Sequence, residues 1–240
     1  MKDLLSALRF FTILPLGPGS NDFSPRRLAA GLPLAGLVVG LLTAVFDLLA
    51  AAFWPAPAVA ALDVVFLAVL TGALHLDGLA DTADGLYAGH SREKALAIMK
   101  DSRTGAMGVV AVACCLLAKW AGLFSLEESR FLLLTLIPAY ARSGVLFGLV
   151  FLEYGRTGEG TARAFFDEPL AASDFRWLAL PVALSLLTGW RFLLLNIGFA
   201  VVVAVVLMFY KRRLGCITGD MFGALIEVSE VALLLVVAAG

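Results

Sequence analysis

Residues 192–210, FLLLNIGFAVVVAVVLMFY, contain no charged side chain and are long enough to cross a bilayer as a helix, which takes about 20 apolar residues. With 61% apolar residues, 15% charged residues and a mean hydropathy of +0.94, the whole chain is far more apolar than a soluble globular protein. Similar apolar segments lie at about 30–53, 57–76, 107–125, 131–152 and 222–240, with a shorter one near 177–189.

These segments are rich in Leu and Ala and lack the alternation expected of membrane strands. Only helices and closed barrels satisfy every backbone polar group inside a bilayer, so the segments predict helices. We therefore predict an all-α, polytopic membrane helical bundle with about seven transmembrane helices, formed by residues 1–240 as one domain. Leu4, Leu8, Phe11 and Pro15 share a face, which predicts an N-terminal amphipathic helix at the cytoplasmic interface.

The basic residues indicate how the chain crosses the membrane. Of the 18 Lys and Arg residues, Lys119 and Arg142 lie within predicted spans and only Arg130 and Arg191 fall on one side. All the others fall on the opposite side, which the positive-inside rule assigns to the cytoplasm. The net charge of −1 gives no indication of a nucleic-acid partner.

Three carboxylates are concentrated in the stretch HLDGLADTADG, residues 75–85. On a helix, Asp77, Asp81 and Asp84 project from one face, where they repel one another unless a cation lies between them. Oxygen ligands suit Mg²⁺ or Mn²⁺, and Asp is a poor helix former, so we favour a magnesium site over a solvated helix end. His75 points about 200° away from Asp77, which favours a supporting role over metal ligation.

Two further segments on the predicted cytoplasmic side carry charge. In residues 100–108, KDSRTGAMG, phosphate could bind Lys100, Arg103 and the free amides of the following helix, although a charged loop before a helix is nearly as good an explanation. Residues 211–220, KRRLGCITGD, begin with a basic cluster that usually serves only as a topology anchor. Charges at membrane depth are costly and tend to be functional or paired, so Arg142 and Glu227 predict a polar cavity in the bundle.

Taken in chain order, these segments resemble the adenosylcobinamide-GDP ribazoletransferase family, also called cobalamin-5′-phosphate synthases. The resemblance rests on residues 75–85, with support from FTILP at 11–15, PLAG at 33–36, KDSRTG at 100–105 and LGCITGD at 214–220. One departure is Cys216, which stands where the family usually has a second glycine. The match covers almost the whole chain.

The resemblance implies a Mg²⁺-dependent membrane enzyme of the final steps of cobalamin biosynthesis, in a prokaryotic cytoplasmic (inner) membrane with its active site facing the cytoplasm. Such an enzyme joins adenosylcobinamide-GDP to α-ribazole or α-ribazole 5′-phosphate and releases GMP. The metal candidates are Asp77, Asp81 and Asp84, and the catalytic candidates are Asp84, Lys100, Asp101 and Arg103. The substrate-binding candidates are His75, Arg142, Arg213, Thr218, Asp220 and Glu227.

Two alternative functions stay open at this point, and so does the formation of a homo-oligomer. CDP-alcohol phosphotransferases also use an Asp-rich membrane helix, but their pattern has Ala-Arg after the Asp-Gly phrase and spaces the later aspartates by four. An ion-coupled transporter could also use intramembrane carboxylates. No inverted repeat is visible, however, and the charged groups gather on one side of the membrane.

Overall fold

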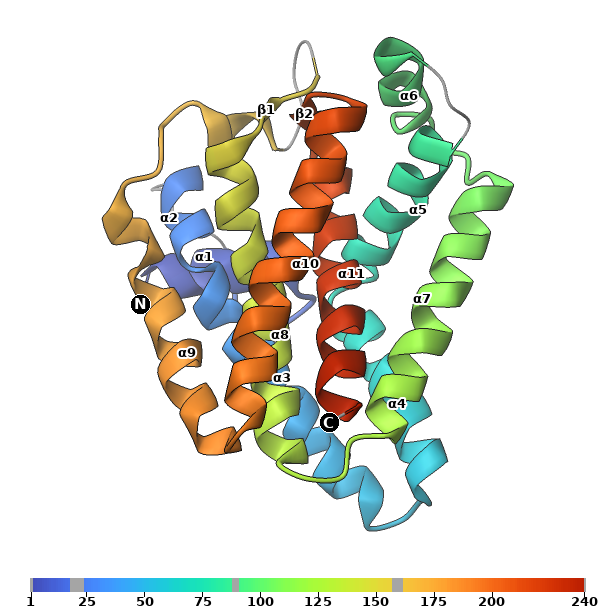
Figure 1. The fold of residues 1–240 in the computed structure, drawn as a ribbon, viewed down its shortest axis with the longest axis vertical. Coiled ribbons are helices and arrows are strands. Elements are labelled where there is room, and N and C mark those ends of the chain that lie inside the picture. The colour runs from blue at the N-terminus through green and yellow to red at the C-terminus, as the bar shows by residue number, and fades with distance from the viewer. Residues whose placement is uncertain (1, 18–23, 88–90, 157–161, 240) are drawn as a thin grey trace.

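The computed structural model describes residues 2–17, 24–87, 91–156 and 162–239, and it shows a bundle of long helices (Figure 1). The long helices are α3 (Leu32–Ala51), α4 (Ala56–Leu70), α5 (Leu74–Tyr87), α7 (Ala106–Phe124), α8 (Arg130–Phe151), α10 (Arg191–Arg213) and α11 (Gly219–Ala238). The short elements are α1 (Lys2–Phe11), α2 (Pro25–Ala30), α6 (Arg92–Ile98), η1 (Arg163–Phe166), η2 (Ala172–Leu178), α9 (Ala179–Ser185) and η3 (Leu186–Thr188). Two short strands, β1 (Glu153–Tyr154) and β2 (Cys216–Ile217), pair in parallel.

The all-α membrane bundle is confirmed, with fewer complete spans than the sequence predicts. Among the described residues, α3, α7, α8, α10 and α11 are each long and apolar enough to cross a membrane, and α4 with α5 would make a sixth, bent span. The predicted short span near 177–189 is wrong as a continuous helix. It consists of η2, α9 and η3, and α9 alone is too short to cross a bilayer.

The predicted span at 57–76 is divided in the structure, because α4 ends at Leu70 and α5 begins at Leu74 with a bend of 89°. Gly72 and Ala73 both adopt left-handed backbone conformations, with φ of 59° and 54°. The Ile13 amide donates to the Leu70 carbonyl (2.9 Å) and so satisfies a carbonyl that the break frees. His75 therefore belongs to the helix of the three aspartates and not to the preceding span.

The α3 and α8 helices cross in backbone contact at the middle of the bundle. A Cβ atom at Gly36 would lie 2.4 Å from the Ala139 Cα, and one at Gly40 would lie 2.2 Å from the Thr135 carbonyl oxygen. Small residues at a spacing of four allow this close approach between membrane helices, whose association is driven by packing. Around this pair, α4 packs on α3, and α10 and α11 pack on α8.

The N-terminal amphipathic helix is confirmed as α1, which lies crosswise to the long helices (Figure 1). Its apolar side packs on the bundle, and Ala7, Leu8 and Phe11 are buried. The predicted face was wrong in one respect, because the helix ends at Phe11 and Pro15 follows it as an exposed residue. The amphipathic face of α1 therefore covers protein.

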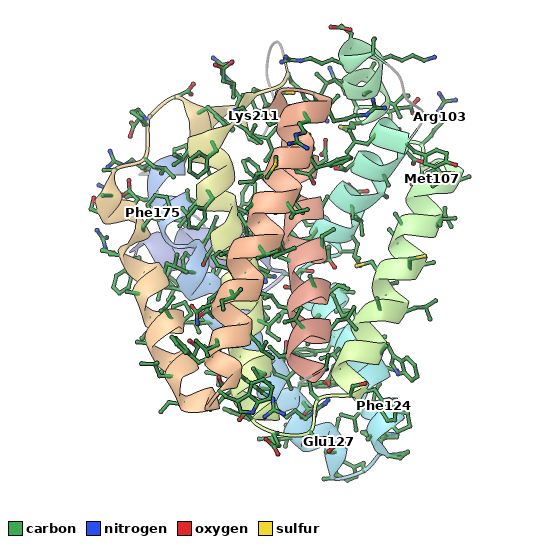
Figure 2. All side chains as sticks on the ribbon, in the orientation of Figure 1. Arg103, Met107, Phe124, Glu127, Phe175 and Lys211 are labelled. Atoms are coloured by element: carbon green, nitrogen blue, oxygen red, sulfur yellow. The ribbon has the colours of Figure 1, made fainter. Side chains whose placement is uncertain are left out.

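The two ends of the bundle differ in the way that the basic residues predict. Figure 2 shows Arg103 and Lys211 at one end and Phe124 and Glu127 at the opposite end. The first end also carries α6 and the β1–β2 pair (Figure 1). The segments that the sequence assigns to a common side of the membrane thus lie together.

The α3–α8 crossing predicts that Gly40→Ala destabilises the protein. The added methyl group would overlap the α8 backbone, and overpacking of this kind typically costs about 1–3 kcal/mol. Thermal unfolding in detergent should show a lower midpoint for this variant. In the control Gly198→Ala, the nearest atom is the end of the flexible Leu233 side chain at 3.3 Å, so little change is expected. Equal stability of Gly40→Ala and wild type would contradict the backbone contact.

Candidate active site

The site is organised by a close crossing of α5 and α11. A Cβ atom at Gly78 would lie 2.7 Å from the Asp220 carbonyl oxygen, and one at Gly223 would lie 3.2 Å from the His75 carbonyl oxygen. The two backbones therefore touch, which glycine alone permits at this separation. As a result, Asp77 on α5 and Asp220 on α11 border the same pocket.

Within residues 214–220, Gly215 and Thr218 fix the position of Asp220. Gly215, with φ of 68°, accepts the left-handed conformation that ends α10, and its amide donates to the Tyr210 carbonyl (3.1 Å). Thr218 then caps α11, because its Oγ1 accepts from the Met221 amide (3.3 Å) and donates to Asp220 Oδ2 (3.4 Å). Thr218, a predicted substrate-binding residue, is thus a buried cap beside the pocket.

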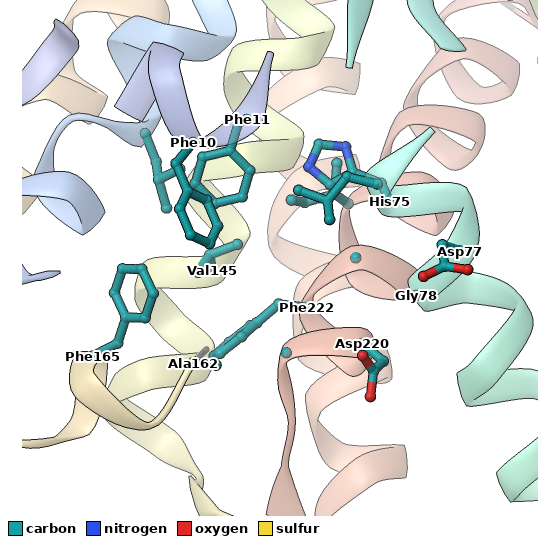
Figure 3. Close-up of a pocket in the computed structure, with 15 residues that line it drawn as sticks. Phe10, Phe11, His75, Asp77, Gly78, Val145, Ala162, Phe165, Asp220 and Phe222 are labelled. Atoms are coloured by element: carbon teal, nitrogen blue, oxygen red, sulfur yellow. The ribbon is translucent and has the colours of Figure 1, made fainter. Parts of the chain in front are cut away.

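The pocket has a volume of about 120 Å³ and two chemically different sides (Figure 3). Phe10, Phe165 and Phe222 line one side, and Asp77 and Asp220 lie on the other (Figure 3). His75 and Phe11 also border it, with their ring centroids 5.7 Å apart. A ligand that fills this pocket would combine an apolar portion with a portion that is cationic, metal-bound or able to donate hydrogen bonds to the carboxylates.

The carboxylates beside the pocket form a strongly acidic group. Asp81 lies within electrostatic reach of Asp77, Asp84 and Asp220, and Arg156 is the cation that opposes this repulsion most directly. Asp77 is exposed, and its carboxylate accepts no hydrogen bond from the other described residues. A set of carboxylates that one arginine neutralises only in part is suited to a hard divalent cation.

The donor set fits Mg²⁺ without forming a closed cage. In the described part of the chain, no group of three or more His, Cys, Asp or Glu residues is placed so that it could hold a metal ion by itself. Mg²⁺ commonly takes one or two carboxylates and completes its shell with waters and substrate phosphates, which Asp77 and Asp81 would permit. The assignment of magnesium to Asp77, Asp81 and Asp84 stays a prediction.

Asp84 has a structural role that the sequence did not suggest. Its Oδ2 accepts from the Gly105 amide (2.6 Å) and its Oδ1 from the Gly108 amide (2.8 Å), so Asp84 caps the N-terminus of α7. Two of the amides expected to be free for phosphate are therefore bound to a side chain of α5. The glycines are required there, because a Cβ atom at Gly105 or Gly108 would lie 2.6 or 2.5 Å from an Asp84 oxygen.

Arg156 is a site residue that the sequence interpretation missed. It forms an ion pair with Asp220 and donates to the Met99 carbonyl (3.1 Å), so it links the segment after β1 to α11 and α6. Its only signal in the sequence was a basic residue just after a predicted span, which reads as an ordinary topology anchor. The β1–β2 pairing brings it to Asp220.

Asp101 and Arg103 pair with each other at the end of the bundle that also carries Lys211 (Figure 2), where Lys100 is exposed. Arg103 donates through Nη2 (2.6 Å) and Nε (3.0 Å) to the Asp101 carboxylate. These hydrogen bonds lower the pKa of Asp101 from its usual value to about 2. Asp101 is therefore a weak base near neutral pH. The proposed catalytic roles of these three residues stay predictions.

Arg142 and Glu227 belong to a buried charge network that does not line the pocket. Lys119 Nζ contacts Glu227 (2.7 Å) and Glu230 (2.8 Å), and Arg142 contacts the other oxygen of Glu230 (2.8 Å). Burial of unpaired charges is costly, so the four residues compensate one another across α7, α8 and α11. Arg213, also predicted to bind substrate, is exposed and donates to the Leu86 carbonyl (3.4 Å). Substrate binding by these residues stays a prediction.

Comparisons with known proteins agree over nearly the whole chain. A family model described as cobalamin-5-phosphate synthase matches residues 3–238. A Geotalea daltonii protein named adenosylcobinamide-GDP ribazoletransferase is 38% identical over 97% of this chain and 95% of its own length. Proteins of the same name from Roseiflexus sp. and Herpetosiphon aurantiacus are each 37% identical, over 95% and 100% of this chain and 86% and 97% of their own lengths. No solved structure matches the chain significantly.

The two roles of the acidic residues predict opposite effects on stability. Asp84→Asn removes the charge that caps α7 and should cost about 1 kcal/mol, the usual loss for a helix cap. Asp77→Asn removes one of several like charges and should leave stability unchanged or slightly higher. Thermal unfolding without divalent cations measures both. An Asp84→Asn variant as stable as wild type would show that the cap is not needed.

Proposed function

The chain belongs to the cobalamin-5-phosphate synthase family, and from this premise we propose that it is an adenosylcobinamide-GDP ribazoletransferase. Its donor would be adenosylcobinamide-GDP, and its acceptor would be the 3′-hydroxyl of α-ribazole or of α-ribazole 5′-phosphate. The products would be GMP and adenosylcobalamin or its 5′-phosphate, in the final steps of cobalamin biosynthesis.

The reaction exchanges one phosphorus–oxygen bond for another. The acceptor 3′-oxygen forms a bond to the phosphorus that carries cobinamide, and the bond from this phosphorus to the bridging oxygen breaks. GMP leaves with the bridging oxygen, and the hydroxyl proton passes to a carboxylate and then to solvent. A bound Mg²⁺ would neutralise charge on the pyrophosphate. The protein's own contribution is to position the two substrates and to stabilise charge.

Asp77 and Asp81 would hold the metal, and Asp77 also borders the pocket. The oxygens of Asp84 and Asp101 already accept hydrogen bonds, which weakens them as bases. Of these three residues Asp77 alone borders the pocket, so through the oxygen that does not bind the metal it is better placed than Asp84 or Asp101 to accept the hydroxyl proton. Asp220, held by Arg156 and Thr218, would orient the acceptor from the opposite helix.

Lys100 and Arg103 would attract the anionic nucleotide at the end of the bundle where Figure 2 places Arg103. The distribution of basic residues supports assigning this end to the cytoplasm, where GDP-activated substrates are available, and the protein to the inner membrane. The single observation that carries the proposal is the α5–α11 crossing, which supports a pyrophosphate site because it joins carboxylates from two helices beside one pocket.

The two alternative functions have less support. The three relatives described above carry one enzyme name and cover almost the whole chain, which favours this transferase over a CDP-alcohol phosphotransferase. The buried Lys119, Arg142, Glu227 and Glu230 compensate one another in ion pairs, an arrangement that favours a structural role over ion coupling by a transporter.

Activity of the purified protein tests the proposal directly. Wild type should release GMP from adenosylcobinamide-GDP only when α-ribazole or its 5′-phosphate and Mg²⁺ are present, and a chelator should stop the release. Asp77→Asn should lower kcat/KM at least tenfold, a loss of about 1.4 kcal/mol in transition-state stabilisation. Asp167→Asn, which alters an exposed carboxylate outside the pocket, is the control. Absence of GMP release by wild type under all these conditions would refute the function.

Cysteine labelling tests the orientation. In a background without the three native cysteines, Ala97→Cys and Ser102→Cys should react with an impermeant reagent only from the cytoplasmic side. Ala56→Cys and Glu128→Cys should react only from the opposite side. All four positions are exposed, so accessibility depends on the side of the membrane. The reverse pattern would place the site away from cytosolic nucleotides.

A further inference from the structure

The aromatic side of the pocket has no part in the phosphoryl chemistry described above. Phe10 and Phe11 reach it from α1, Phe165 from η1 and Phe222 from α11, so three separate elements contribute rings to one small space. The Phe10 and Phe165 rings meet edge to face at 6.2 Å. Walls of this kind favour a flat aromatic ligand, which can stack on one ring and contact the edge of another.

His75 supplies a polar group that lacks a partner at this pocket. Its side chain is only 2% exposed, and neither ring nitrogen has a hydrogen-bond partner among the described residues. Leaving a buried polar group without a partner is costly, so such a group in a native protein requires an explanation. Figure 3 shows His75 at the rim of the pocket, between Phe11 and Asp77. A ligand with one polar ring atom would satisfy it.

The size and polarity of the pocket indicate which portion of the two substrates it can bind. An engineered apolar cavity of about 150 Å³ in another protein encloses benzene, so this partly open pocket of about 120 Å³ can enclose about one ring of a flat ligand whose remainder extends from its mouth, and it excludes a corrin. Guanine carries polar groups around most of its edge, and here it would meet mainly phenylalanine rings. The benzimidazole base of a ribazole is flat and apolar, with one ring nitrogen free to accept a hydrogen bond.

We propose that this pocket binds the benzimidazole base of the ribazole acceptor between Phe10, Phe165 and Phe222, with His75 donating to its free ring nitrogen. The ribose then projects toward Asp77, on the acidic side of the pocket (Figure 3). This assignment rests on the proposed function, because it takes the acceptor from it. It adds a specificity site and makes α1 part of the enzyme's acceptor pocket.

Binding of α-ribazole without any corrinoid donor tests the pocket separately from catalysis. Isothermal titration of the detergent-solubilised wild type should show binding, and Phe165→Ala should weaken it at least tenfold. Phe10→Leu, which removes a ring while keeping an apolar side chain, is a second variant if Phe165→Ala fails to fold. Phe175→Ala is the matched control, since Phe175 is also half-buried on a 3₁₀ helix and meets Phe147 edge to face at 5.4 Å.

Steady-state kinetics should show the same selectivity. The variants Phe165→Ala and Phe10→Leu should raise the KM for α-ribazole and leave the KM for adenosylcobinamide-GDP near that of wild type. His75→Phe keeps an aromatic ring and removes the donor, so it should weaken binding of α-ribazole. His75→Gln restores a donor and should recover part of the affinity.

Four outcomes would overturn the pocket assignment. They are unchanged ribazole binding in both phenylalanine variants, a rise in the KM for the corrinoid donor instead, an equal effect of Phe175→Ala, and ribazole binding by His75→Phe that is as tight as that of wild type or tighter. If any of these occurs while wild type still releases GMP, the pocket assignment fails and the proposed function stands. If wild type binds α-ribazole in the pocket but never releases GMP, the proposed function fails instead.

Discussion

The backbone contact between α5 and α11 is the constraint on which the candidate site depends. Gly78 and Gly223 lie at this crossing, and a side chain at either position would push the helices apart. Because the helices touch, Asp77 and Asp220 border one pocket although they are far apart in the chain. Their mutual repulsion is tolerated since glycine packing, the Thr218 cap and the Arg156 ion pair hold the two helix ends in place.

Buried ion pairs orient the remaining helices. Helix association in a bilayer gains little from the hydrophobic effect, so complementary charges at membrane depth are effective determinants of which faces meet. Lys119, Arg142, Glu227 and Glu230 join α7, α8 and α11, and Arg130 joins α8 to Asp47 on α3 and Asp63 on α4. Removing one member of the four-residue network leaves an uncompensated charge, so this network favours a single arrangement of α7, α8 and α11.

The sequence predicted features that depend on local pattern and composition. The apolar segments, the basic side and the clustering of carboxylates were visible because each is a property of consecutive residues. The break before Leu74 was missed, since a glycine inside an apolar run does not reveal its dihedral angles. The Asp84 cap of α7 and the Arg156 contact with Asp220 were also missed, because both require knowing which distant segments meet.

The break between α4 and α5 helps to form the pocket. Irregular backbone at membrane depth is stable only where protein surrounds it or where it lines a cavity. The pocket is lined by Leu74, His75 and Asp77, which follow the break closely. The amide of Ile13, in the segment after α1, donates to the Leu70 carbonyl, the last carbonyl before the break. A straight helix would have carried the aspartates along the direction of α4. The bend instead turns them toward α11, so a local irregularity brings the acidic and aromatic sides of the pocket together.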